Sequence, residues 1–408
     1  MATPRGRGPR DPRRGRGVPI LGAGLVVVAA AVVGLVAIVG TLGISLTGGG
    51  PASAGSAAVG ASVGPTGPGD LTSATDEAAS GPGTSPSGSS SASPASSPPA
   101  SGPPGIVLRE GCDAGTNPIP AANRLMANEY RLTPKPTVRL PANPTWRENP
   151  FHDNLWQFHY HSLVYVLQLE GAWARTGENR YLDRAVFLLR DWLRDNPRSN
   201  PPSPFSWNDH STAWRAAVLA CTAEIVPVST WLRQALLLHG STLADPAFYR
   251  RHGNHALNQS IALLDVGHVL NRTDWMQLAS ARINALIEES VDVQGVTNEQ
   301  SIGYQLYNYR RYLSAEDRLH ACGQPISRAF ARVAKMPTFL GWATLPNGEY
   351  ELIGDTSAAV ATSIPGTLAE FAATAGTSGP PPAADFMAYD AGYAFGRTGW
   401  GAARPFAD

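Results

Sequence analysis

The stretch HGNHALNQSIALLDVGHVL, residues 252–270, carries the pattern that decides the fold. Its apolar residues recur every three or four positions, as Leu257 and Ile261 do, which is the spacing of one face of an α-helix. The same spacing returns over residues 275–286, after a polar break at residues 271–274 that fits a helix cap. The two segments therefore predict a pair of antiparallel helices joined by a short turn.

This helical spacing continues on both sides of the pair and fills most of residues 151–345. The other segments that show it lie around residues 156–167, 182–193, 214–221, 232–236, 304–319 and 327–342. Pro227 and Gly240 punctuate the pattern, and no strand-like alternation of comparable length interrupts it. The segments predict roughly eight helices in four antiparallel hairpins. Because the repeat is too irregular for a helical solenoid, an all-α, incomplete (α/α) toroid fits better.

The first residues of the chain have a different composition. Residues 1–17 contain six arginines and one acid, and residues 18–46 contain no ionisable side chain. This apolar run exceeds the roughly 20 residues that a helix needs to cross a bilayer, and the flanking arginines predict a cytoplasmic N-terminus. We therefore expect a basic cytoplasmic tail, a single-pass transmembrane signal-anchor at the cell membrane and an extracellular body. The alternative is a signal peptide cleaved at Ala52-Ser53-Ala54, which gives a secreted protein.

Two further segments separate the apolar run from the helical body. Residues 47–104 are almost wholly Gly, Ser, Ala, Pro and Thr, which predicts a disordered linker. Seven prolines in residues 105–150 exclude long helices and predict an extended segment wrapped over the body. Removing the tail's six arginines and one acid from the 32 residues of each sign leaves 26 bases against 31 acids. This mildly acidic balance predicts that nucleic acid is not a partner.

The sequence beyond residue 345 changes character again. A loop rich in Gly, Pro and Ala follows Gly354 and Asp355, and residues 386–400 then alternate aromatic with small residues. We expect residues 346–408 to form a loop and the start of a truncated β-sandwich, because even a small sandwich needs roughly 100 residues.

The cysteines and histidines indicate no metal site. Cys112, Cys221 and Cys322 lie in the part expected outside the cell, where one disulfide can form and one thiol is left over. Their spacing does not show which two pair. No CxxC motif exists, and the three histidines of residues 152–161 do not share one helix face. We therefore expect no metal and no cofactor.

Three polar motifs stand out in the helical body. They are Trp207-x-Asp209-His210-Ser211-x-Ala213-x-Arg215, His252-Gly253-Asn254-His255 and Glu299-x-Ser301-x-x-Tyr304. Each has a purely structural interpretation as well: an asparagine at a helix start is often a cap, and a histidine there often packs in the core. Asp209 and His210 either line a cleft or cap the helix that follows them.

In order and spacing these motifs resemble those of the heparinase II/III family of polysaccharide lyases, over roughly residues 146–400. The resemblance implies an α/α toroid followed by a β-sandwich, with the active site in the cleft between them. In this family the sandwich commonly supplies a further histidine, and a histidine is expected after the tyrosine, where this chain has Gln305.

The resemblance also implies a reaction, β-elimination at a uronic acid. The proton on C5 is removed, and the 4-linked glycosidic bond then breaks. Asn254 is implied to stabilise the enolate-like intermediate, and Tyr304 looks like the family's catalytic tyrosine. Because a free tyrosine has a pKa near 10, Tyr304 needs neighbouring cations to act as a base near neutral pH. The candidates for these cations are His210, His255, Arg310 and Arg311. His255 is alternatively the base itself.

The remaining site residues are expected to bind substrate. We assign this role to His210, Arg215, Glu299 and Arg310, with the alternative that Glu299 and Arg215 simply pair with each other. Tyr307 is a weaker candidate for the catalytic tyrosine, and a structural role suits it better.

The function predicted from these motifs is cleavage of an acidic, uronic-acid-containing polysaccharide, heparin/heparan-like or alginate-like. Two alternatives stay open. One is an α/α-toroid glycoside hydrolase with Asp209 and Glu299 as its carboxylate pair. The other is a non-catalytic carbohydrate-binding scaffold at the cell wall.

Overall fold

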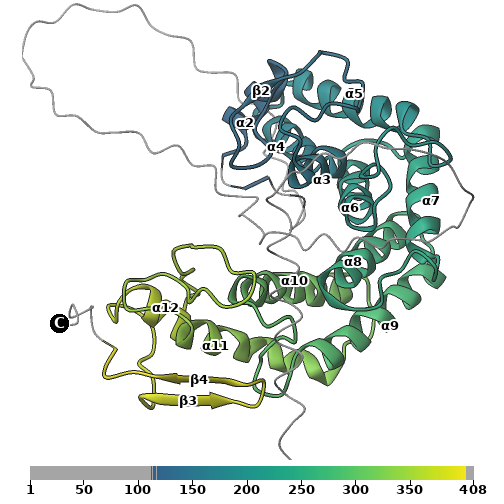
Figure 1. The fold of residues 1–408 in the computed structure, drawn as a ribbon. Helices are drawn as coiled ribbons and strands as arrows, with labels where there is room; N and C mark the ends of the chain where they lie inside the picture. The colour runs from purple at the N-terminus through teal and green to yellow at the C-terminus, as the bar shows by residue number, and fades with distance from the viewer. Residues whose placement is uncertain (1–111, 113, 116, 401–408) are drawn as a thin grey trace, which may run out of the picture. The chain divides into compact units, whose positions relative to one another are not determined.

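The computed structural model describes Cys112, Ala114, Gly115 and residues 117–400 (Figure 1). The expected cytoplasmic tail, transmembrane helix and linker all lie outside these residues. Within the described part of the chain, no helix is long and apolar enough to cross a membrane.

Most of the described chain is helical. The α-helices are α2 (Ile119–Met126), α3 (Asn154–Ser162), α4 (Val166–Thr176), α5 (Asn179–Asp195), α6 (Asp209–Ile225), α7 (Thr230–Ala244), α8 (Gly253–Val269), α9 (Thr273–Ser290), α10 (Ile302–Ala321), α11 (Met336–Trp342) and α12 (Leu368–Ala373). A 3-10 helix, η2 (Arg328–Lys335), precedes α11. The strands are β1 (Glu129–Tyr130), β2 (Val138–Arg139), β3 (Phe386–Tyr389) and β4 (Tyr393–Gly396), paired antiparallel as β1-β2 and β3-β4.

The helices between α4 and α9 pack as successive pairs, α4 with α5, α6 with α7 and α8 with α9. Helix α6 also contacts α3 and α8, and α8 contacts α10. Figure 1 shows α7 and α9 on the outer side of α6 and α8, so the helices form two layers. The prediction of an all-α body built from helical hairpins is confirmed.

Two helix boundaries differ from the sequence prediction. The segment expected as one helix over residues 156–167 is divided at Leu163, whose φ of 58° is left-handed. The carbonyl of His161 accepts a hydrogen bond from Arg215 at 2.6 Å, so that the side chain of another helix takes an acceptor at the end of α3. Gly240, expected to end a helix, lies inside α7. A Cβ there would come within 2.1 Å of the Trp275 ring, so glycine is needed for α7 and α9 to approach.

One disulfide joins the segment that precedes α2 to helix α6. It links Cys112 to Cys221, 109 residues apart, with the two Cα atoms 5.4 Å from each other. Cys322, at the end of α10, is not part of it. The proline-rich segment is therefore covalently fixed to the helical body, a pairing that cysteine spacing left open.

A buried acid between α4 and α6 makes stability depend on pH. Glu170 is 1% exposed and accepts a hydrogen bond of 2.6 Å from the Thr222 hydroxyl. Burial raises the pKa of Glu170 from 4.5 to about 8. Because the folded protein holds this proton more tightly than the unfolded chain, the stabilisation is complete below pH 4.5 and is lost as pH rises through about 8.

We expect Glu170→Gln to remove that loss. The free energy of unfolding of the wild type should fall between pH 5 and pH 8 by at most about 3 to 4 kcal/mol from this group, whereas the variant should lack this fall. Urea unfolding at both pH values measures it. Glu178→Gln, at an exposed carboxylate at the start of α5, is the control. Equal pH dependence in both variants would contradict the assignment.

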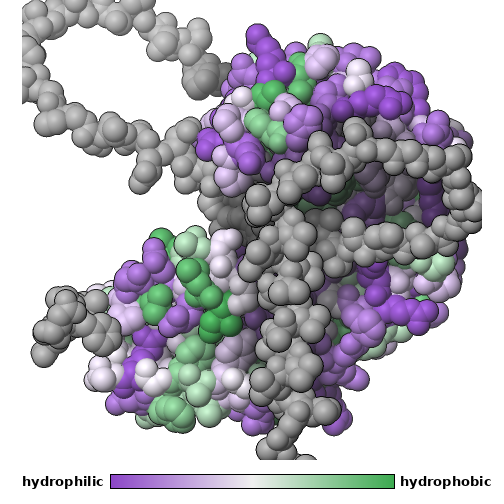
Figure 2. Space-filling model, in the orientation of Figure 1, coloured by the Kyte–Doolittle hydropathy of each residue, from purple (hydrophilic) through white to green (hydrophobic). Residues whose placement is uncertain are grey.

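The C-terminal part of the described chain has a second, smaller core. Phe339 of α11 packs against Tyr389 and Tyr393 of the β3-β4 hairpin, with ring centroids 5.0 Å apart in both pairs. The expected strands in residues 386–400 are therefore present, while their membership of a β-sandwich stays a prediction. Figure 2 shows apolar surface on this part of the molecule. The most exposed large hydrophobic side chains, 60–76% exposed, are Val293, Leu352, Val360 and Phe386.

Candidate functional site

The candidate site begins at the N-terminus of α8, where Glu299 binds the start of the helix. The backbone N–H of Asn254 donates to Glu299 Oε1 at 3.0 Å, and its side-chain Nδ2 donates to Oε2 at 2.8 Å. Asn308 of α10 donates to the same carboxylate at 3.1 Å. A carboxylate suits this position because the first N–H groups of a helix lack partners within the helix. Glu299 thus fixes the orientation of the Asn254 amide.

One helical residue further, His255 forms a dyad with Asp209 of α6. His255 Nδ1 lies 2.7 Å from Asp209 Oδ2, and Arg250 Nε donates to the same oxygen at 2.9 Å. Burial raises the pKa of Asp209, but the hydrogen bonds from His255 and Arg250 outweigh it and hold that pKa well below its usual value. The carboxylate is therefore ionised at neutral pH, and His255 donates to it through Nδ1.

His210 lies against this dyad in a stack of rings. Its centroid is 4.0 Å from that of His255 and 4.8 Å from that of Phe158 on α3. Its Nε2 lies 2.9 Å from the indole nitrogen of Trp214 and 2.8 Å from Asn258 Nδ2. Burial, and next the neighbouring His255, lowers the pKa of His210 well below its usual value. His210 is thus a neutral ring beside the dyad.

Tyr304, in the first turn of α10, is 6% exposed. Its ring packs edge to face against that of Tyr307, with the two ring centroids 6.4 Å apart. Burial raises the pKa of Tyr304 well above its usual value, and Glu299, Asp355 and Tyr307 raise it further. The expectation that cations lower this pKa is therefore wrong. The Tyr304 hydroxyl keeps its proton at neutral pH and is suited to donate it.

One residue predicted to bind substrate, Arg215, lies in the core instead. Arg215 is 0% exposed, and its guanidinium donates to His239 Nε2, His161 O and Ser206 O while lying 3.6 Å from the centre of the Trp192 ring. It holds the core together and cannot contact a polysaccharide, nor does it pair with Glu299. The prediction that Arg215 binds substrate is therefore corrected, because the N–H donors of its guanidinium are bound to acceptors in the core. Arg310 is exposed on α10, and its role stays a prediction.

Several residues of the site were not among the predicted ones. They are Trp214, Arg250, Asn258 and Asn308. Asn258 appears in the sequence only at the head of an Asn-x-Ser triplet, yet its side chain is 3% exposed and reaches the Tyr307 hydroxyl at 2.7 Å. The guanidinium carbon of Arg311, one of the cations expected near Tyr304, lies 4.9 Å from the centre of the Trp214 ring. Helical position gives the only sequence signal for Asn258, which follows His255 by about one turn.

The start of α10 is held by a turn that includes Gly354. The Thr356 hydroxyl oxygen accepts hydrogen bonds from the N–H groups of Ile302 and Gly303 at 2.9 and 3.1 Å. Gly354, at φ 62°, lies so close that a Cβ would come within 2.4 Å of the carbonyl oxygen of Gln300. This contact fixes the loop that connects Glu299 to Tyr304.

We expect Gly354→Ala to lower both stability and activity. Gly348→Ala is a matched control, because that glycine also has a positive φ, 82°, but a Cβ there meets nothing within 4 Å. Both variants carry the left-handed backbone cost of roughly 1–2 kcal/mol, and Gly354→Ala should lose more by the added clash. Thermal unfolding and steady-state rates measure the two. Equal losses would show that the contact with Gln300 does not matter.

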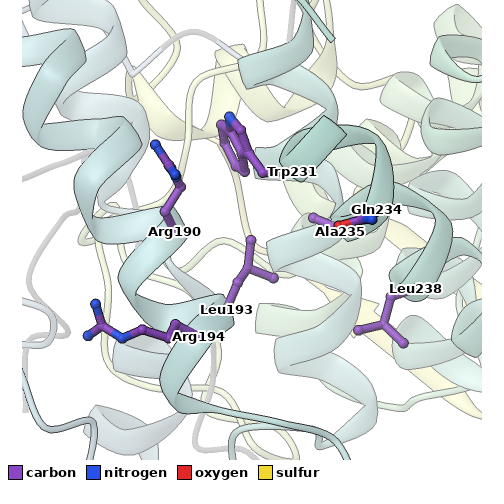
Figure 3. A pocket seen from close by; sticks show the side chains of 7 residues that line it. All are labelled: Arg190, Leu193, Arg194, Trp231, Gln234, Ala235 and Leu238. Carbon is purple, nitrogen blue, oxygen red and sulfur yellow. The ribbon is translucent and has the colours of Figure 1, made fainter. Parts of the chain in front are cut away.

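A separate pocket of about 270 Å³ lies between α5 and α7, where Figure 3 shows Arg190 and Trp231 along its wall. None of the predicted site residues lines it. Within the described residues, no group of three or more His, Cys, Asp or Glu side chains is arranged to hold a metal ion. The expectation of no metal stays a prediction.

The fold and the site define a helical protein with an asparagine and a histidine-carboxylate dyad at the start of α8 and a buried tyrosine at the start of α10. The profile of the heparinase II/III N-terminus matches residues 127–356, more than half of the chain. The chain therefore belongs to the heparinase II/III family, through its N-terminal domain. Among curated proteins, none matches this sequence.

Solved structures resemble the fold. A mutant of the heparan sulfate lyase HepC from Pedobacter heparinus matches with a TM-score of 0.50 and 18% identity, over 70% of this chain and 49% of that one. HepC itself matches with a TM-score of 0.50 and 17% identity, over 69% of this chain and 48% of that one. The chain thus spans about half the length of these structures, and the likeness concerns the fold.

Proposed function

We propose that the protein is a polysaccharide lyase that cleaves a uronic-acid-containing polysaccharide by β-elimination. The observation that carries this proposal is the 2.7 Å hydrogen bond between His255 and Asp209, next to Asn254, in a member of the heparinase II/III family. A uronate needs three things from the protein: a base for C5, stabilisation of the carboxylate and an acid for the leaving oxygen. The site offers one candidate for each.

His255 is the proposed base. Since Asp209 is ionised and accepts the Nδ1 hydrogen, neutral His255 carries a lone pair on Nε2. Nε2 takes the C5 proton, the C5–H electron pair forms the C4–C5 double bond, and the bond from C4 to the glycosidic oxygen breaks. The Asp209 carboxylate then stabilises the imidazolium that has formed.

Asn254 is the proposed partner of the substrate carboxylate. Glu299 accepts hydrogen bonds from the backbone N–H of Asn254 and from one hydrogen of the Asn254 Nδ2 group. The second hydrogen of Nδ2 is outside that pair. A fixed donor of this kind stabilises the enolate-like charge that develops as C5 loses its proton. Because Glu299 holds the amide before substrate arrives, no reorganisation is needed during the reaction.

Tyr304 is the proposed acid. Its pKa is raised by burial and by Glu299, so the hydroxyl keeps its proton in neutral and mildly alkaline solution. It donates this proton to the leaving glycosidic oxygen. The same shift disfavours a role for Tyr304 as the base.

The glycoside hydrolase alternative requires a carboxylic acid that is protonated near neutral pH. Asp209 is ionised and bound by His255 and Arg250, so it cannot serve as that acid. The other carboxylate, Glu299, accepts three N–H hydrogen bonds and is already bound to Asn254 and Asn308. The lyase reaction needs neither carboxylate as an acid: Asp209 orients His255, and Glu299 orients Asn254.

The test is incubation of the full chain with heparin, heparan sulfate and alginate, followed by ultraviolet absorbance of unsaturated uronate ends. The proposal expects this absorbance to rise with at least one of these polymers. New reducing ends without the double bond would favour the hydrolase. Binding without turnover would favour the carbohydrate-binding scaffold, and both outcomes contradict the proposal.

Replacing the proposed acid gives a sharper expectation. We expect Tyr304→Phe to lower kcat by about 10² to 10⁴-fold, the usual contribution of a general acid, with a smaller change in KM. Tyr309→Phe is the matched control, because Tyr309 lies on the same helix and packs between the two cores. A variant at position 304 as active as the control would exclude Tyr304 as the acid.

We also propose that the body lies outside the cell. The Cys112–Cys221 disulfide supports this, since such bonds persist in oxidising compartments. A protease added to intact cells should digest the body under this proposal. Protection until the membrane is opened would contradict it.

A further inference from the structure

A chain of hydrogen bonds runs from α6 to α10 behind the His255–Asp209 dyad. Trp214 Nε1 lies 2.9 Å from His210 Nε2, which lies 2.8 Å from Asn258 Nδ2. Asn258 Nδ2 in turn lies 2.7 Å from the Tyr307 hydroxyl oxygen. The proposed reaction uses none of these four side chains directly, yet His210 stacks on the proposed base at 4.0 Å.

The indole of Trp214 sets the direction of the first bond. An indole N–H only donates, so His210 Nε2 must present a lone pair. Neutral His210 therefore carries its hydrogen on Nδ1. A hydrogen on Nε2 would face the indole hydrogen directly and break the contact.

The acceptor state of His210 Nε2 also determines the orientation of the Asn258 amide. Because His210 Nε2 is an acceptor, the amide turns its NH₂ group toward it and toward the Tyr307 oxygen. This orientation leaves Asn258 Oδ1 buried and without a hydrogen bond. The reverse orientation would give that oxygen the Tyr307 hydrogen but set it against the His210 lone pair.

We infer that Trp214 is a positioning residue, which together with Asn258 locks His210 as the neutral Nδ1–H tautomer so that only His255 of the stacked pair accepts a proton. A charged ring at 4.0 Å would repel the proton that His255 takes from C5 and weaken it as a base. The inference rests on the proposed function only for its effect on rate. The tautomer itself does not depend on it.

The charges around His210 agree with this arrangement. On its own helix Asp209 favours a charged His210, but that carboxylate is occupied by His255 and Arg250. From α10 Arg311, from α8 His255 and from α3 His159 all oppose a positive charge there. The two donors to Nε2 therefore act in the same direction as the surrounding field.

The experiment is nitrogen-15 NMR of the histidine rings in the full chain, with the His210 signals assigned by their loss in His210→Gln. In the wild type, we expect His210 Nε2 to give an unprotonated signal and Nδ1 a protonated one from pH 8 to pH 5. Trp214→Phe removes the donor and keeps an aromatic ring beside Arg311. Asn258→Asp replaces the other donor by an acceptor of the same size. In both variants Nε2 should acquire hydrogen.

Trp231→Phe, a tryptophan in the pocket between α5 and α7, is the control and should leave the His210 signals unchanged. A protonated Nε2 in the wild type, or an unprotonated Nε2 retained in both variants, would overturn the inference. If Trp214→Phe fails to fold, Asn258→Asp and the wild-type tautomer still decide it. Where elimination is measurable, the two variants should lower kcat and move the acidic limb of the pH–rate profile to lower pH. Absence of elimination with the expected tautomer would count against the proposed function alone.

Discussion

Replacing His255 by glutamine should slow elimination by about 10² to 10⁴-fold, the range for loss of a general base. Glutamine is close in length but cannot take the C5 proton, so kcat should fall while KM changes little. The reason is geometric: Asp209 holds His255 Nδ1 at 2.7 Å and leaves Nε2 for the substrate. Steady-state rates on the polyuronate that the wild type cleaves fastest measure the effect.

His252→Gln provides the matched control for this substitution. His252 is three residues away, its side chain is 72% exposed, and it contacts Glu289 at 2.6 Å instead of Asp209. Its substitution should leave the rate close to that of the wild type. Equal losses in the two variants would show a general effect on the start of α8, and full activity of His255→Gln would remove His255 as the base.

The second large effect concerns stability. Replacing Cys112 and Cys221 together by serine should lower the free energy of unfolding by about 4 to 5 kcal/mol, as expected for opening a loop of roughly 100 residues. The disulfide links residues 109 positions apart, and the loop that it closes runs from before α2 through most of α6. Denaturant unfolding of the oxidised wild type and of the double variant measures the difference.

Cys322→Ser is the control for the disulfide, because Cys322 is not part of it. It should stay within about 1 kcal/mol of the wild type, the range of most mild substitutions. A reductant should bring the wild type and Cys322→Ser to the stability of the double variant. If the reductant changes nothing, or if the double variant is as stable as the wild type, the disulfide does not constrain the unfolded chain as described.

The fold was largely predictable, because helical spacing of apolar residues is a local signal. It located α6 through α10 and the strands near Tyr389 and Tyr393. The same signal misplaced a helix boundary where a side chain from a distant part of the sequence determines it. Arg215 takes the carbonyl at the end of α3, and Trp275 requires a glycine at position 240 within a continuous α7. The spacing of apolar residues in α3 or α7 gives no sign of either contact.

The site was predictable in its residue types but only partly in its contacts. Motif order brought Asn254, His255 and Tyr304 into one hypothesis, whereas the partner of His255 is Asp209, 46 positions away. Arg215 shows the opposite error, since a motif arginine looks like a substrate ligand until its burial is known. The protonated state of a tyrosine likewise depends on burial and on acids from other segments.

The central claim, elimination rather than hydrolysis, is tested most directly by mass spectrometry of the products formed in water enriched in oxygen-18. A lyase breaks the C4–O bond without adding water, so the two fragments should together have the mass of the substrate and contain no heavy oxygen from the cleavage. The fragment with the new non-reducing end should carry the double bond. Fragments that together gain one water and carry heavy oxygen would show hydrolysis and contradict the account.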